Sequence, residues 1–100
     1  MTTLEPDRKP RFPMGTIKVT AQARAVLTEA EIRRALARHG QGDWGLVDEE
    51  TKAENEGGIG YPRLAICSRY VAGKGGHFWV MTQPERQQTM VTLGTLPEFR

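Results

Sequence analysis

The sequence has little of several residue types that define whole classes of protein. Its 100 residues include one cysteine, two histidines and seven aromatic residues. The single Cys67 excludes an internal disulfide and a cysteine-based metal cluster within this chain. No apolar run approaches the roughly 20 residues of a membrane-spanning helix. The first ten residues lack the apolar segment of a secretion signal. We therefore expect a cytoplasmic domain that does not enter membranes, with Cys67 as a small buried hydrophobe.

Charge is present, but it is divided unevenly along the chain. Residues 1–40 carry eight Lys and Arg against four Asp and Glu, a net charge of +4. Residues 41–60 carry one against six, a net charge of −5, and residues 61–100 carry five against two, a net charge of +3. This division within a total of +2 favours a surface that binds a partner of complementary charge.

The N-terminal half predicts a basic arm followed by a strand and helices. Residues 1–13 combine three prolines with Arg8, Lys9 and Arg11, which predicts a flexible basic arm. Residues 14–20 alternate like a strand. From residue 21 to 38 the composition is helical, and Thr28 with Glu31 has the spacing of a capping box. We therefore expect a short helix before Thr28 and a second helix after it.

The C-terminal half predicts a short helix and three strands. Asp48 is a suitable N-cap, and the glycines from residue 57 onward should end any helix that it starts. Strands are predicted at 63–71, 77–82 and 88–93, separated by a glycine-rich turn and a proline turn. The predicted fold class is α+β. An N-terminal strand and helices pack on an antiparallel meander of three to four strands, in a single domain over residues 14–100.

Residues 14–99 also carry a series of short motifs in a fixed order. They are a Gly-x-Ile strand, the run Ala-Arg-His-x-x-Gly-Asp-Trp-Gly, then Ser-x-Tyr, Trp-x-x-Thr and Leu-Pro-Glu. This order resembles a family of short bacterial proteins found on plasmids and other mobile elements, loosely labelled as restriction-endonuclease-associated. The matching residues are Gly15, Ile17, Thr20, Ala37, Arg38, His39, Gly42, Asp43, Trp44, Gly45, Asn55, Ser68, Tyr70, Trp79, Thr82, Arg86, Thr89, Leu96, Pro97 and Glu98. The chain departs from the pattern at Glu85, Met90 and Phe99, where that family has Asp, Thr and Tyr. The resemblance implies a mobile-element setting but no mechanism.

The stretch from His39 to Gly45 is the most distinctive part of these motifs. It is not a dinucleotide fingerprint, because it follows a helix rather than a strand. His39 and Asp43 are separated by glycines and lack the further ligands of a metal site. We therefore expect neither a cofactor nor a metal. The stretch is predicted to be an architectural corner in which Trp44 packs on the core and Asp43 pairs with backbone or arginine.

Two functions remain open from the sequence. The preferred one is a non-catalytic mobile-element accessory protein that binds a protein or ribonucleoprotein, such as an anti-CRISPR or anti-restriction inhibitor of host defence. Nucleic acid is a possible partner as well. The candidate contact residues for that function are Arg34, Arg38, Asp43, Trp44, Asp48, Glu49, Glu50 and Glu54. The alternative is a small metal-independent ribonuclease or toxin of barnase or RelE type. Its candidate catalytic residues are His39, Arg69, Arg86 and Thr89.

Overall fold

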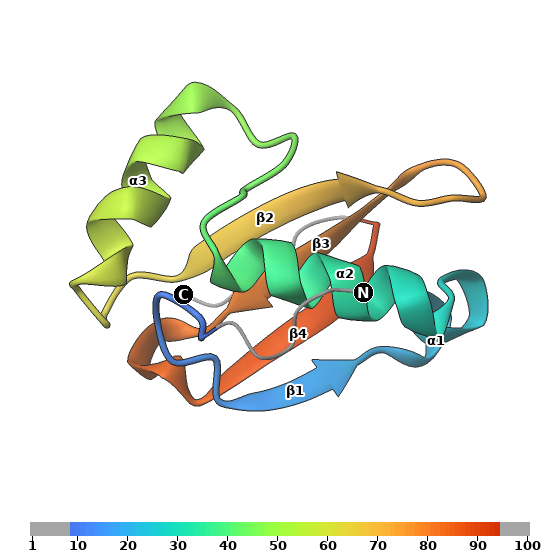
Figure 1. The fold of residues 1–100 in the computed structure, drawn as a ribbon, viewed down its shortest axis with the longest axis horizontal. Helices are drawn as coiled ribbons and strands as arrows, with labels where there is room; N and C mark the ends of the chain where they lie inside the picture. The colour runs from blue at the N-terminus through green and yellow to red at the C-terminus, as the bar shows by residue number, and fades with distance from the viewer. Residues whose placement is uncertain (1–8, 95–100) are drawn as a thin grey trace.

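In the computed structural model, residues 9–94 are described and form an α+β fold (Figure 1). A strand and three helices come first: β1 (Thr16–Val19), α1 (Ala21–Val26), α2 (Glu29–Gly40) and α3 (Glu49–Ile59). They are followed by β2 (Ile66–Val71), β3 (His77–Thr82), the short 3-10 helix η1 (Pro84–Arg86) and β4 (Gln88–Leu93). The predicted fold class is therefore confirmed.

Threonine side chains cap the first two helices, and the cap of the second helix is the one that the sequence predicts. The Thr20 side chain accepts a hydrogen bond from the Ala23 N–H at the start of α1. At α2 the Thr28 hydroxyl accepts from the Glu31 N–H at 3.0 Å, and the Glu31 carboxylate accepts from the Thr28 N–H at 2.8 Å. This reciprocal pair is a capping box, and it confirms the predicted break between the helices.

Helix α3 starts at the predicted cap and ends within the predicted glycine-rich run. The Asp48 carboxylate accepts from the Thr51 N–H at 2.8 Å. The helix includes Gly57 and Gly58, ends at Ile59 and has Gly60 as its C-cap. A Cβ built on Gly58 would lie 3.4 Å from Ile66 and 3.5 Å from Leu64, so the bare backbone packs close to these side chains. Tertiary contacts thus override the low helix propensity of glycine here.

The four strands form one sheet in the order β1-β4-β3-β2. β2, β3 and β4 make the predicted antiparallel meander, and β1 pairs with β4 in parallel. Strand alternation gives the sheet two faces. Ser68, Tyr70 and Val80 are on the inner face toward α2, whereas Cys67, Arg69 and their cross-strand partners Met81 and Trp79 are on the outer face. Figure 1 shows α1 and α2 lying across one face and α3 standing beside the β2 edge.

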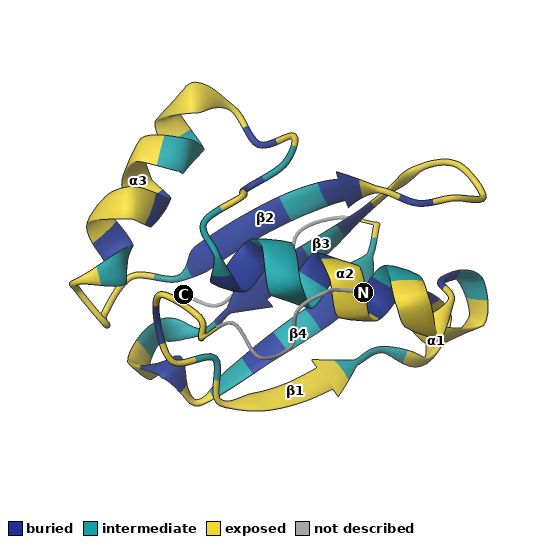
Figure 2. Cartoon of the chain, viewed as in Figure 1, coloured by how far each residue is buried: buried dark blue, intermediate teal, exposed yellow. Residues whose placement is uncertain are grey.

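The buried residues form two clusters. The larger one packs α1 and α2 against the sheet, and its members are Ala23, Leu27, Ile32, Ala35, Tyr70, Ala72, Phe78, Val80 and Val91. The smaller one joins Phe12, Trp44, Val47 and Ile66. Figure 2 shows burial concentrated in the meander, while β1 and most of α3 are exposed.

The ordered contacts begin before the predicted domain boundary at residue 14. Phe12 is only 3% exposed and belongs to the smaller core cluster. The Arg11 N–H donates to the Gly40 carbonyl at 2.7 Å, and the Arg11 side chain pairs with Glu56. Residues 9–13 of the predicted arm are therefore part of the domain, because an aromatic side chain anchors them. Residues 1–8 of that arm lie outside the described residues.

Candidate functional site

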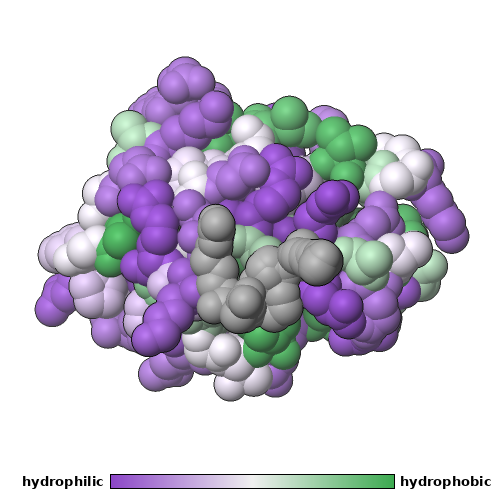
Figure 3. All heavy atoms as spheres, in the orientation of Figure 1, coloured by the Kyte–Doolittle hydropathy of each residue, from purple (hydrophilic) through white to green (hydrophobic). Residues whose placement is uncertain are grey.

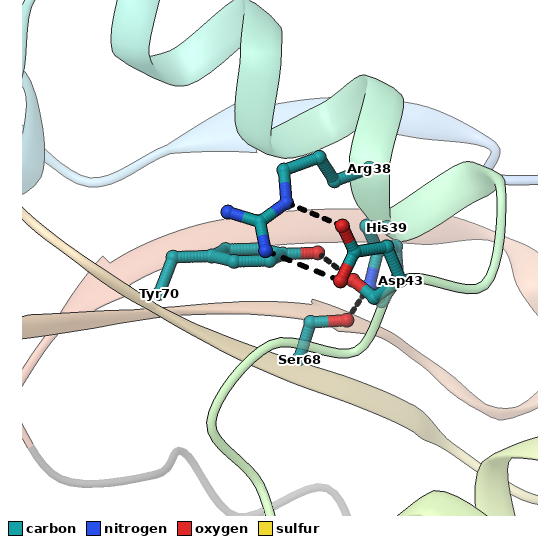
Figure 4. Close-up of polar contacts among 5 residues, drawn as sticks. All are labelled: Arg38, His39, Asp43, Ser68 and Tyr70. Atoms are coloured by element: carbon teal, nitrogen blue, oxygen red, sulfur yellow. Dashed lines mark hydrogen bonds and ion pairs between the residues drawn. The ribbon is translucent and has the colours of Figure 1, made fainter.

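The corner after α2 is held by a pair of charged residues (Figure 4). Arg38 Nε and Nη2 donate to the two carboxylate oxygens of Asp43 at 2.7 and 3.1 Å. The guanidinium lies 4.5 Å from the centre of the Tyr70 ring, and the Tyr70 hydroxyl donates to the Asp43 carbonyl at 2.7 Å. The hydrogen bond from Arg38 holds the pKa of Asp43 below its ordinary value. The predicted pairing of Asp43 is confirmed, and both groups are engaged with each other.

His39 lies inside the protein, beneath this corner. Its side chain has no exposed surface, and the rings of Phe12 and Trp44 lie edge-on to it at 5.3 and 5.9 Å. Nδ1 is 2.6 Å from the Ser68 hydroxyl and Nε2 is 2.9 Å from the Thr82 hydroxyl. Burial lowers the pKa of His39 to about 3. The ring is therefore neutral near pH 7.

The hydrogen-bond chain beyond His39 assigns its tautomer. The Thr89 hydroxyl donates to the Met14 carbonyl at 2.7 Å, because a carbonyl oxygen can only accept. Thr89 must then accept from the Thr82 hydroxyl, 2.7 Å away. Because the Thr82 hydroxyl donates its hydrogen to Thr89, its oxygen accepts a hydrogen bond from His39 Nε2–H. His39 Nδ1 therefore carries no hydrogen and accepts from the Ser68 hydroxyl. Every member of this buried chain is satisfied, so the chain acts as a structural link between α2 and the sheet.

Arg86 is likewise buried, with 8% of its surface exposed. Its guanidinium donates to the carbonyls of Gly58 at 2.5 Å, Leu64 at 2.6 Å, Tyr61 at 3.3 Å and Gln83 at 3.4 Å. Gly58 and Tyr61 lie at the C-terminal end of α3, where the helix dipole favours a cation. Arg86, in η1, therefore caps the C-terminal end of α3.

These positions bear on the ribonuclease hypothesis. His39 and Thr89 have no exposed surface, and Arg86 is buried among carbonyl oxygens. The structure brings these three together in the interior, with their polar groups paired to protein. Arg69 lies apart from them, on the outer face of the sheet. None of the three buried side chains is in a position to meet a substrate in this conformation.

A groove lies between α3 and the outer face of the sheet. We call it the α3 groove; its volume is about 540 Å³ and it is open to solvent. Its residues come from α3 and the loop before it, from the loop before β2, and from β2 and β3. They are Leu46, Val47, Asp48, Thr51, Glu54, Asn55, Arg63, Leu64, Ala65, Cys67, Arg69, Trp79, Met81 and Pro84.

Polar contacts, together with the packing of Ile59, hold α3 beside the groove. Its sequence, Glu-Glu-Thr-Lys-Ala-Glu-Asn-Glu-Gly-Gly-Ile, has no apolar stripe. The Asn55 amide donates to the Cys67 carbonyl and accepts from the Cys67 N–H. Glu56 accepts from the Trp44 indole at 3.0 Å and pairs with Arg11. The surface over α3 is accordingly hydrophilic, at the upper left of Figure 3.

The floor of the groove is built on Trp79 and Arg69, which face each other across β2 and β3. The Arg69 guanidinium lies 5.3 Å from the centre of the Trp79 ring, and its Nη2 donates to the Leu46 carbonyl at 2.8 Å. The Trp79 indole donates to the Gly94 carbonyl at 2.6 Å. Cys67 is also here; burial raises the pKa of its thiol to about 12, so it is present as an unreactive thiol.

Comparison with known proteins identifies no relative of this chain. No family model, curated protein or solved structure matches this chain. The resemblance to the mobile-element family therefore stays a hypothesis drawn from its motifs. The fold and the groove must be interpreted from their own chemistry.

Residues 9–94 contain neither a helix able to span a bilayer nor a cluster of metal ligands. No helix in that range has the length and apolar character needed to cross a bilayer. No three His, Cys, Asp or Glu side chains in that range gather closely enough to hold a metal ion.

Three of the residues singled out from the sequence meet at the α3 groove: Asp48, Glu54 and Arg69. Glu49 and Glu50 are exposed on the first turn of α3, and Glu49 pairs with Lys52 at 3.3 Å. Arg34 is exposed on α2. Trp44 is only 4% exposed, which confirms the prediction that it packs on the core.

Sequence reasoning missed the apolar part of the groove. Leu46, Leu64 and Met81 line it, and none was singled out. Leu46 and Leu64 are 44% and 42% exposed, although their residue type predicts burial. Leu64 was expected on a strand with Ile66, but β2 begins only at Ile66. The one signal of the groove in the sequence was Leu46, an apolar residue in the polar loop before α3.

Proposed function

We propose that this protein is a non-catalytic binding protein that engages a macromolecular partner through the α3 groove. The observation that carries the proposal is the groove itself. It combines exposed Leu46 and Leu64, a partly exposed Trp79 and an acidic helix in one concavity. Binding interfaces typically place an aromatic or aliphatic anchor inside a polar rim.

The interior position of the proton-transfer candidates supports a non-catalytic role. A general base must come within hydrogen-bond reach of the proton that it removes. Both ring nitrogens of His39 are already bonded to Ser68 and Thr82. The titratable groups at the groove are carboxylates, arginines and the Cys67 thiol, whose raised pKa makes it a poor nucleophile.

We propose further that the partner belongs to host defence, as a protein or ribonucleoprotein of a CRISPR or restriction system. The support for this setting is the motif resemblance together with the separation of charge between residues 41–60 and the rest. An acidic surface of this kind suits the occupation of a basic, nucleic-acid-binding channel.

The test is affinity capture from bacterial hosts that express such systems, with a matched pair of variants. Leu64→Glu places a charge at the groove, and Ile17→Glu places the same charge at a residue of equal exposure, 43%, on β1. The proposal expects a captured partner that Leu64→Glu loses and Ile17→Glu keeps, with both variants folded by circular dichroism. Charge reversal at Glu49, Glu50 and Glu54 should weaken the same complex. Equal recovery of the partner by all variants would show that the groove is not its binding site.

A further inference from the structure

The carboxylates of α3 are not all neutralised by neighbours. Residues 48–59 carry five carboxylates against Lys52, a net charge of −4. Glu56 is paired with Arg11 and Glu49 with Lys52. Asp48, Glu50 and Glu54 make no ion pair with another residue in the 9–94 range, and Asp48 and Glu54 line the groove. Glu50 and Glu54 are four residues apart and so lie on one face of the helix.

The positive charges at the groove are placed differently. The Arg69 guanidinium lies over the Trp79 ring and donates to the Leu46 carbonyl, so part of its bonding capacity is already used. Arg63 is exposed in the loop before β2. The groove thus has an acidic wall on α3, a floor formed by Trp79, Arg69 and Met81, and Arg63 in the loop before β2.

We propose that the occupant of the α3 groove is an extended peptide segment of the partner in which an apolar side chain stands beside a lysine or arginine. The apolar side chain packs on Trp79 and Leu64, and the cation pairs with Glu54. This inference rests on the proposed binding function and specifies the chemistry of its partner.

Charge complementarity and size select this occupant over others. A nucleic-acid phosphate would face the net charge of −4 on residues 48–59, which repels it. A volume of about 540 Å³ is in the range that holds a drug-sized ligand, and so holds a few side chains rather than a helix. A long cationic side chain can lay its apolar stem along the floor and keep its charge at the acidic wall.

The experiment is a titration of the isotopically labelled protein followed by NMR, with three probes. They are the capped peptide Gly-Ser-Lys-Leu-Lys-Ser-Gly, the same peptide with glutamate for both lysines, and oligothymidylate. The basic peptide should shift the Trp79 indole resonance and the Leu46 and Leu64 methyl resonances saturably. Glu54→Lys should weaken that binding by about three- to tenfold, because it replaces an attraction at an exposed site with a repulsion. Glu29→Lys, the same change on exposed α2, should leave it unchanged.

Three results would overturn the inference: no saturable shift at the groove with the basic peptide, equal shifts with the acidic peptide or oligothymidylate, or unchanged affinity in Glu54→Lys. The capture experiment separates this failure from failure of the proposed function. If Leu64→Glu still loses a captured partner, the groove binds but with other chemistry. If Leu64→Glu loses nothing, the binding function itself is wrong.

Discussion

The side chain of Asn55 pairs with the backbone of Cys67 as a neighbouring strand would. Its Nδ2 donates to the Cys67 carbonyl at 2.7 Å, and its Oδ1 accepts from the Cys67 N–H at 3.1 Å. β2 is the last strand of the sheet, so these backbone groups have no strand partner on that side. One amide of α3 thus satisfies a donor and an acceptor at a sheet edge, and only 1% of Asn55 is exposed.

Replacing Asn55 with alanine should therefore destabilise the protein by about 2–4 kcal/mol, because two buried backbone groups lose their partners. The measurement is the urea midpoint of unfolding. Glu54→Ala, at the exposed neighbouring position, is the control and should change the free energy of unfolding by less than about 0.5 kcal/mol. Equal effects of the two changes would contradict the assigned role of Asn55.

His39 should make stability depend on pH in mildly acid solution. Its pKa is about 3 in the folded protein, against about 6.5 in an unfolded chain. Between these values the unfolded state binds a proton that the folded state does not, so the free energy of unfolding falls as the pH falls. The stabilisation is fully present above pH 6.5, and about 2 kcal/mol is lost by pH 5.

Urea unfolding at pH 7, 6 and 5 measures this dependence. His39→Gln should have a lower free energy of unfolding at pH 7, but that free energy should depend much less on pH. His77→Gln, at the exposed start of β3, should keep the wild-type dependence. A wild-type slope that survives in His39→Gln would show that another group is responsible.

Arg86→Lys should destabilise the protein although it keeps the charge. A lysine ammonium has no planar fork with which to reach the carbonyls of Gly58, Leu64 and Tyr61 together. We expect a loss of about 2–3 kcal/mol in the free energy of unfolding. Arg34→Lys, on the exposed side of α2, is the matched control and should be neutral within about 0.5 kcal/mol. Chemical denaturation of both variants provides the comparison.

Alanine substitutions at two glycines should have opposite effects. Gly45 has φ of +73°, and a Cβ there would lie about 2.0 Å from the Arg69 carbonyl oxygen, where the chain pairs with β2. Gly45→Ala should cost at least about 3 kcal/mol. Gly57 is in α3 with open space around it, so Gly57→Ala should add about 0.5–1 kcal/mol. Thermal unfolding measures both, and a mild effect at Gly45 would mean that this loop can move away from β2.

Local signals in the sequence were sufficient for much of the fold. The capping box at Thr28 was predicted from two residue types three positions apart, and the cap at Asp48 from its residue type. Such short-range bonds recur in many contexts. The ends of β3 and β4 followed from alternation and turn residues. Pairing of Asp43 with an arginine was one of two predicted alternatives, and Arg38 is the arginine that it binds.

The candidate site depended on contacts distant in sequence, which local patterns do not encode. Phe12 was placed in a mobile arm because prolines surround it, yet it packs beside His39. Arg86 reaches carbonyls 22 to 28 residues earlier in the chain. The α3 groove exists because Asn55 and Arg86 fix a polar helix beside the sheet. Nothing in the spacing of Leu46 and Leu64 indicated that they would share its wall.

The residues of α3 fall into two groups, one that the fold requires and one that it does not. Asn55, Glu56 and the backbone of Gly58 hold it in place, whereas Glu50 and Glu54 contact solvent and contribute little to folding. Substitutions at the second group can accumulate without loss of the native state. Lineages that face a changing binding partner could therefore diversify this helix rapidly, while its three attachments stay the same.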